Sequence, residues 1–218
     1  MYKYTTKFVS DLLFKKNCIR IGTLNGYRDM EAKQGISDPL EGSYHETLII
    51  DRFNEQEYYK DPILRENVQH GFHIEQGAIN CQIIECEVES EIKSHNYLIF
   101  CTANKQSKEV MSEFEDATIC YQIHKIQSFY QLITWKLEKL FESNLKFHGV
   151  VPVHYDEYNR LNSDIRSRRL SPVIAKTSEF SPQCELRAIW EVPEELIKEP
   201  HYDLQILGLS KTCRIIDV

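Results

Sequence analysis

The sequence predicts an α+β domain with mixed sheets and flanking helices. Short segments rich in Ile, Val, Phe, Tyr and Cys are scattered among single helical segments and do not alternate strictly with them. No internal repeat, low-complexity tract or Pro/Gly-rich linker divides the chain, and 218 residues with 42% hydrophobic content can supply one sizeable core. We therefore expect a single domain over residues 1–218.

Nine segments have the composition of strands. Two of them, residues 79–88 (INCQIIECEV) and 97–102 (YLIFCT), are the strongest candidates for central strands because they are rich in apolar and β-branched or aromatic residues and have charged flanks. Residues 149–155 contain Pro152, which favours an edge position. The expected strands are 1–6, 18–23, 47–52, 79–88, 97–102, 117–123, 149–155, 188–192 and 213–218.

Helical spacing is clearest over residues 125–142. Ile126, Phe129, Ile133 and Leu137 recur at intervals of three or four, so one face of this helix must be buried. Weaker patterns predict helices over 7–16 and 107–115, and Pro193 is a usual first helical residue. The polar segment 54–69 shows no clean period, so no element is predicted there.

Composition excludes several classes of protein. The formal charge of −7 and pI near 5.7 argue against broad attraction to nucleic acid or anionic lipid. No apolar run is long enough to span a membrane, and the first residues lack the order of a secretory signal, so we expect a cytoplasmic protein without a membrane partner. Neither a P-loop nor a Rossmann glycine motif is present.

The seven cysteines also predict an intracellular protein. Their number is odd and no two form a CxxC pair, which is typical of reduced thiols that pack as small hydrophobic side chains. Histidines at matching metal-ligand intervals are lacking, so no metal is expected. Cysteine-hydrolase chemistry is disfavoured because its local signatures are missing.

Residues 183–192 carry the most suggestive polar pattern. In an extended strand, Glu185 and Arg187 point to one face, whereas Leu186, Ala188 and Trp190 point to the other, which is expected to be core. A carboxylate and a guanidinium at this spacing are most often a salt-bridged solvent face. The alternative is a functional site, because the triplet Gln183-Cys184-Glu185 follows a loop that contains Phe180.

Four separated segments extend this pattern over most of the chain. They are Tyr2-Lys3-Tyr4-Thr5 with Ile19-Arg20-Ile21-Gly22-Thr23 after a helix, Asp38-Pro39-Leu40-Glu41, Tyr97 to Ala103, and Lys176 through Phe180 to Glu185-x-Arg187. Together they resemble the bacterial abortive-infection and defence proteins with an ADP-ribosyltransferase-like fold. The resemblance implies split β-sheets around a cleft for NAD, and transfer of ADP-ribose to a macromolecular acceptor, a protein or a nucleic acid, in conflict between bacteria and phages.

The resemblance also implies roles for individual residues. Glu185 would be the catalytic carboxylate beside the nicotinamide ribose, where it can stabilise developing positive charge. Phosphates would be met by a guanidinium fork, Arg20 or Arg28, and Gly22 and Gly26 would let the backbone approach the dinucleotide closely. The expected cofactor-binding residues are Tyr4, Thr5, Arg20, Gly22, Thr23, Arg28, Thr102, Gln183 and Arg187.

Two departures from the family pattern leave a second interpretation open. Cys101-Thr102-Ala103 stands where Ser-x-Ser is frequent, and Tyr4 stands where a histidine is usual. Both changes are compatible with a catalytically inactive module that binds a nucleotide-like ligand or a protein partner, since fold alone does not establish activity. An accidental resemblance would leave an α+β domain of unassigned function. The basic cluster Arg166, Arg168 and Arg169 is either a solvated face or a surface that steers a phosphorylated target.

Overall fold

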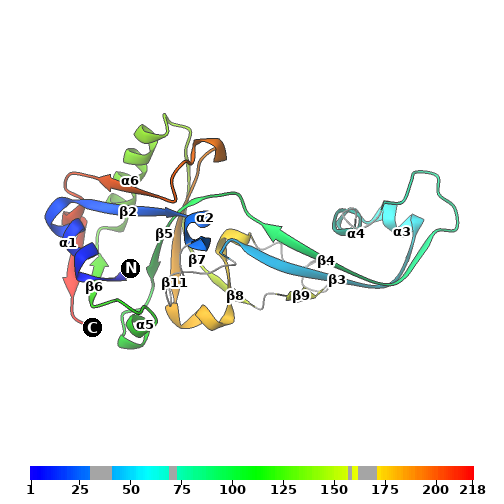
Figure 1. Ribbon diagram of the computed structural model, residues 1–218, viewed down its shortest axis with the longest axis horizontal. Helices are drawn as coiled ribbons and strands as arrows, with labels where there is room; N and C mark the ends of the chain where they lie inside the picture. Colours follow the sequence, from blue (N-terminus) through cyan, green and yellow to red (C-terminus); the bar gives the residue numbers. More distant parts are fainter. Residues whose placement is uncertain (30–40, 69–72, 157–158, 162–170) are drawn as a thin grey trace.

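The computed structural model describes residues 1–29, 41–68, 73–156, 159–161 and 171–218 (Figure 1). It confirms a mixed α+β architecture with antiparallel sheets and flanking helices. Among the described residues, no helix is long and apolar enough to cross a membrane. The basic cluster around Arg166 and the residue Asp38 lie outside the described residues.

The main sheet has eight strands, and every pairing within it is antiparallel. Its strands are β1 (Tyr2–Thr5), β2 (Cys18–Thr23), β5 (Leu98–Ala103), β6 (Ile119–Ile123), β7 (Lys146–Pro152), β11 (Glu185–Glu191), β12 (His201–Gln205) and β13 (Cys213–Ile216). Strand β5 is central, as the sequence predicts for this segment, and among the described strands β7 pairs with β11 alone, as expected for an edge strand. Strand β12 was not among the predicted elements.

The main sheet forks at β5. One edge of β5 pairs with β11 from Leu98 to Ala103. Its other edge pairs with β2 at Leu98 and Ile99, and with β1 at Ala103. Between these pairings, the carbonyl oxygen of Cys101 accepts a hydrogen bond from Nζ of Lys3 at 2.7 Å. The Lys3 ammonium thus satisfies a backbone acceptor at the point where β1 and β2 diverge.

Helix α6 (Ile126–Leu140) covers one face of the main sheet. Phe129, Ile133 and Leu137 are buried against apolar residues of β2, β5 and β11, as the helical spacing predicts, and Trp190 donates from Nε1 to the Thr134 hydroxyl at 2.8 Å. The other helices of the main body are α1 (Lys7–Lys16), α2 (Leu24–Arg28) and α5 (Lys108–Ser112).

The opposite face of the main sheet lies under irregular structure. Leu24 of α2 and Val173 pack there against Ile99 and Ile189. The covering elements are 3-10 helices η1 (Pro172–Ile174) and η2 (Ser178–Gln183), and the parallel pair β8 (His154–Asp156) and β10 (Ala175–Thr177). Two further 3-10 helices, η3 (Glu194–Leu196) and η4 (Leu209–Thr212), lie in connections, so the helix expected from Pro193 is a single 3-10 turn.

A long arm projects from the main body (Figure 1). It consists of β3 (Ser43–Asn54) and β4 (Gln82–Lys93), with α3 (Glu55–Lys60) and α4 (Pro62–Val68) at its far end and β9 (Asn159–Leu161) beside β3 near its base. A separate hydrophobic cluster around Phe53, Tyr58 and Leu64 holds the far end together.

The arm corrects two sequence predictions. Residues 79–88 are not part of a central strand, because among the described strands β4 pairs only with β3, and exposed side chains alternate with partly buried ones along residues 85–93. Residues 54–69, where no element was predicted, contain α3 and α4. A capping box begins α3: the Asn54 side chain accepts from the Glu57 backbone, and Glu57 accepts from the Asn54 backbone.

Candidate functional site

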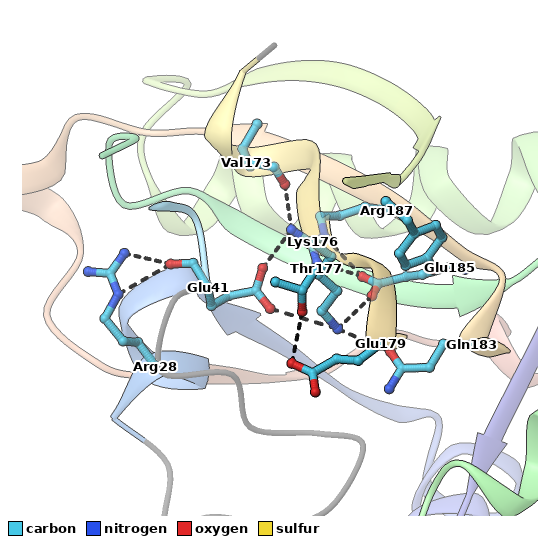
Figure 2. A network of polar contacts seen from close by, with 10 residues as sticks. Arg28, Glu41, Val173, Lys176, Thr177, Glu179, Gln183, Glu185 and Arg187 are labelled. Atoms are coloured by element: carbon cyan, nitrogen blue, oxygen red, sulfur yellow. Dashed lines mark hydrogen bonds and ion pairs between the residues drawn. The ribbon is translucent and has the colours of Figure 1, made fainter. Parts of the chain in front are cut away.

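Four charged side chains meet beneath η1 and η2, on the sheet face opposite α6 (Figure 2). They are Glu41, Lys176, Glu185 and Arg187, here called the ionic cluster. Arg187 is fully buried, and each of the other three exposes less than a tenth of its surface. Charges so deeply buried require partners, and these four side chains supply them to one another.

Arg187 joins the two carboxylates. Its Nη1 lies 2.7 Å from Oε1 of Glu41, and its Nε donates to Oε1 of Glu185 at 2.9 Å. Nη1 also donates to the backbone carbonyl of Val173 in η1. A guanidinium suits this position because its donors form a planar fork that can meet two acceptors at once.

Lys176 closes the cluster from β10. Its Nζ donates to Oε2 of Glu185 at 3.0 Å and to Oε1 of Gln183 at 3.1 Å, and it lies 4.0 Å from Oε2 of Glu41. The ammonium also lies 4.6 Å from the ring centroid of Phe180, where the aromatic face attracts a cation. Both oxygens of Glu185 are therefore engaged by cations.

Local sequence explains how the side chains reach one another. Glu185 and Arg187 alternate on β11 and share a face, as the strand period predicts. Cys184 adopts a left-handed conformation (φ 49°) between η2 and β11, which ends the turn carrying Gln183. Of the two alternatives for this pair, the salt-bridged solvent face is wrong, because η1 and Glu41 cover this face.

The ion pairs determine the charge states. Burial alone would raise the pKa of Glu185, but Arg187 and Lys176 more than offset this, and the pKa lies well below its ordinary value. For Lys176, burial would lower the pKa, but Glu185 and Glu41 raise it above its ordinary value. Glu185 therefore stays ionised near neutral pH, which suits electrostatic stabilisation of a cation rather than proton transfer.

Cys101 and Tyr27 adjoin the cluster and were not predicted as site residues. The Cys101 side chain is within hydrogen-bonding reach of Glu185, and burial raises the pKa of its thiol to about 12. Burial likewise raises the pKa of Tyr27. The Glu185 N–H donates to the hydroxyl of Tyr155 at 2.8 Å. Both flanking groups thus stay neutral, and the close ion pairs of the site are those of the four ionic side chains.

Two predicted phosphate ligands bind other parts of the chain. Arg20 donates from Nε and Nη2 to the Asp203 carboxylate of β12, at 2.8 and 2.9 Å, in an exposed pair. Arg28 donates to the backbone carbonyl of Glu41 and so anchors a member of the cluster from outside.

The predicted hydroxyl residues are also engaged. Tyr4 donates to the carbonyl of Lys105 at 2.8 Å and accepts from the Ser107 N–H at 2.8 Å. Thr102 donates to the carbonyl of Leu186 at 3.3 Å, and it alternates with Cys101 on β5, so it faces the α6 side and not the cluster. Thr23 caps α2, and Thr5 ends β1 opposite Ile119.

The predicted glycines make room for the chain itself. A Cβ at Gly22 would clash with the Tyr27 ring, and one at Gly26 would clash with the carbonyl oxygen of Pro200. Both glycines therefore permit close internal packing.

Of the predicted site residues, the structure brings Gln183, Glu185 and Arg187 together, and Arg28 touches them through Glu41. Lys176 and Glu41 lie in the motif segments but were not among the expected cofactor-binding residues. Among the described residues, no group of three or more His, Cys, Asp or Glu side chains could hold a metal ion. Comparisons with models of protein families, with curated protein sequences and with solved structures find no match to this chain.

Proposed function

We propose that this chain is an ADP-ribosyltransferase-like protein that binds NAD on the sheet face carrying the ionic cluster and transfers ADP-ribose to a macromolecular acceptor. One observation carries the proposal. Two segments of the suspected motif, remote in sequence, supply Glu41 and the three residues Lys176, Glu185 and Arg187 to a single buried cluster. Burying four charges is costly, so a cluster kept only for stability would be a poor solution.

The proposed chemistry uses the permanent charge of Glu185. The bond between nicotinamide nitrogen and ribose C1′ breaks, and its electron pair leaves with nicotinamide. A nucleophile of the acceptor then forms the new bond to C1′. Positive charge develops on the ribose between these events, and an ionised carboxylate in a low-dielectric site stabilises it. Arg187 and Lys176 keep Glu185 ionised. As the cations that contact Glu185, they would also bind the phosphates of NAD.

A non-catalytic binding module of the same fold is the second candidate. It is favoured by the engagement of both Glu185 oxygens, since a ribose hydroxyl would reach this carboxylate only by replacing Lys176 or Arg187. The existing contacts of Arg20, Tyr4 and Thr102 point the same way. This module would bind a nucleotide or a protein partner without turnover.

Nicotinamide release and nucleotide binding separate the two candidates. Catalysis predicts NAD-dependent labelling of bacterial protein or nucleic acid, or slow NAD hydrolysis, abolished in Glu185→Gln and retained in Glu191→Gln. Glu191 is a matched control because it is an exposed carboxylate on the same strand. Equal nicotinamide release by wild type and Glu185→Gln would refute catalysis by Glu185.

Thermal unfolding with NAD or ADP-ribose tests binding itself. A nucleotide at 100 times its Kd stabilises the fold by about 2.7 kcal/mol. A rise in Tm without nicotinamide release would support the binding module. An unchanged Tm with both nucleotides would exclude nucleotide binding in either candidate.

The proposed setting is the bacterial cytoplasm during conflict with phages. All seven cysteines are free thiols in the structure, which fits a reducing compartment. If the chain is a toxin of this kind, wild type should slow the growth of a bacterial host and Glu185→Gln should not. Equal growth of both strains at equal protein levels would contradict the toxin role.

A further inference from the structure

Within the described residues, one strand of the arm has an edge that no other strand pairs with. Strands β3 and β4 each have 12 residues, so the arm reaches about 40 Å at about 3.3 Å per residue. Within the described residues, β3 separates β4 from β9, and no strand pairs with the outer edge of β4. Unpaired backbone donors and acceptors along such an edge can add a further strand.

The two faces of β4 differ in chemistry along this edge. Glu87 and Glu89 are exposed on one face, and no described side chain forms an ion pair with either of them. Glu91 continues the row but is paired with Lys93 at 2.9 Å. On the other face, Val88 and Ile92 are partly buried. The edge between residues 87 and 92 therefore alternates negative charge with apolar or small side chains.

We propose that the outer edge of β4 at residues 87–92 binds an extended segment of a partner protein in which basic residues alternate with apolar ones. An added strand places its side chains beside those of β4 on the same face, so Lys or Arg would lie beside Glu87 and Glu89. Its intervening apolar residues would lie beside Val88 and Ile92. This interaction does not depend on nucleotide binding.

Charge selects this partner over a second copy of the chain. If β4 paired with β4 of another copy, glutamates would gather on the same face of the joined sheet, and like charges opposite one another are destabilising. Charged edges also prevent self-association. If the glutamates only prevent self-association, no ligand should bind this edge. If the edge binds a partner, a ligand of complementary charge should bind it, so the two roles can be distinguished.

The base of the arm holds this edge in a fixed place. The Ser94 N–H donates to the Gly42 carbonyl at 3.0 Å and closes the base. Arg28 binds the carbonyl of Glu41, whose carboxylate lies in the ionic cluster. A strand mounted in this way is presented to a partner without loss of conformational freedom in the arm base.

Peptide binding to the full-length protein tests the proposal. The probe is a fluorescent peptide of alternating Lys and Val, about eight residues long, the length of an ordinary strand. The same residues in block order, four Lys and then four Val, form the control peptide. We expect anisotropy to report binding of the alternating peptide, and hydrogen exchange to show slower exchange at β4 amides.

Charge reversal locates the site. Glu87→Lys combined with Glu89→Lys should weaken binding roughly tenfold or more, because two favourable cross-strand pairs become repulsive. Glu194→Lys combined with Glu195→Lys makes the same change of charge on exposed η3 and should leave the affinity unaltered. Circular dichroism confirms that each variant is folded. The proposal is overturned if the alternating peptide fails to bind, if block order binds equally well, if β4 amides gain no protection, or if both double variants lose affinity equally.

Discussion

Replacing Arg187 with methionine tests whether the ionic cluster is as tightly coupled as its geometry indicates. Methionine keeps an unbranched apolar stem but removes the guanidinium that lies 2.7 Å from Glu41 and 2.9 Å from Glu185. Lys176 would still meet Glu185 at 3.0 Å, but it lies 4.0 Å from Glu41. Both buried carboxylates thus lose the guanidinium that pairs with them, and breaking a buried ion pair from one side typically costs about 3 to 5 kcal/mol.

A matched variant isolates the effect of burial. Arg20→Met removes another two-point arginine–carboxylate pair from the main sheet, but the Arg20 side chain is 57% exposed. An exposed pair contributes roughly 0 to 1 kcal/mol, since water and salt screen it. Urea unfolding of both variants, followed by circular dichroism, gives the two changes in unfolding free energy directly.

The thermal readout has a comparable range. In a chain of this size, each kcal/mol of lost stability lowers the Tm by about 2 to 4 °C. The Tm should therefore fall by roughly 6 to 20 °C in Arg187→Met and by no more than about 4 °C in Arg20→Met. Equal losses in the two variants would refute the view that burial makes the cluster energetically distinct. Adding Glu41→Gln to Arg187→Met should recover part of the loss, because the two changes are coupled.

Three further variants test separate parts of the fold. Folding lowers the pKa of Glu185, so its contribution to stability is present above the ordinary pKa of 4.5 and is lost as pH falls toward the folded value. Below about pH 5, the unfolding free energy of Glu185→Gln should therefore depend less steeply on pH than that of wild type. An unchanged slope would contradict the lowered pKa. Gly22→Ala places a methyl group against the Tyr27 ring and should cost about 1 to 3 kcal/mol in urea unfolding; a neutral result would mean that the ring moves freely. Tyr4→Phe leaves the Ser107 N–H without its acceptor and should cost about 1 to 3 kcal/mol in thermal unfolding; an unchanged Tm would contradict this role of the hydroxyl.

Local sequence patterns predict the elements whose structure depends mainly on their own residues and little on the segments packed around them. Helix α6 was predictable because Phe129, Ile133 and Leu137 repeat at helical spacing and all face one sheet. The placement of β4 was not, because apolar residues at 83–88 suggest burial on both faces, whereas the alternating glutamates that follow indicate one exposed face. The Asn54 and Glu57 capping box was the available signal for α3.

The site was predictable only within single strands. Period-two alternation placed Glu185 and Arg187 on one face. Burial of that face depends on Glu41 and Val173, which arrive from distant segments. The partner of Arg20 is 183 residues away in sequence, on a strand that no pattern predicted, so an arginine expected to bind phosphate is engaged by Asp203 instead.

Charge balance in the ionic cluster leads to a last prediction about ligands. Two cations face two carboxylates, so the four side chains are neutral in sum and offer an anionic ligand no surplus positive charge. Glu41 competes with phosphate for Arg187 under the proposed function. Removing its charge in Glu41→Gln should therefore tighten ADP-ribose binding roughly tenfold, since one unit charge at a few ångströms is worth a few kcal/mol before screening.

Isothermal titration of Glu41→Gln with ADP-ribose measures this change. A second titration with nicotinamide riboside, which carries no phosphate, separates phosphate contacts from ribose contacts. Only the phosphate-bearing ligand should gain affinity. Glu191→Gln controls for overall charge, because Glu191 is exposed at the end of β11 and pairs with His148 rather than with the cluster. Unchanged or weaker ADP-ribose binding in Glu41→Gln would mean that phosphates do not meet Arg187 or Lys176, and the nucleotide would then have to bind away from Glu185, where this carboxylate cannot act on the ribose.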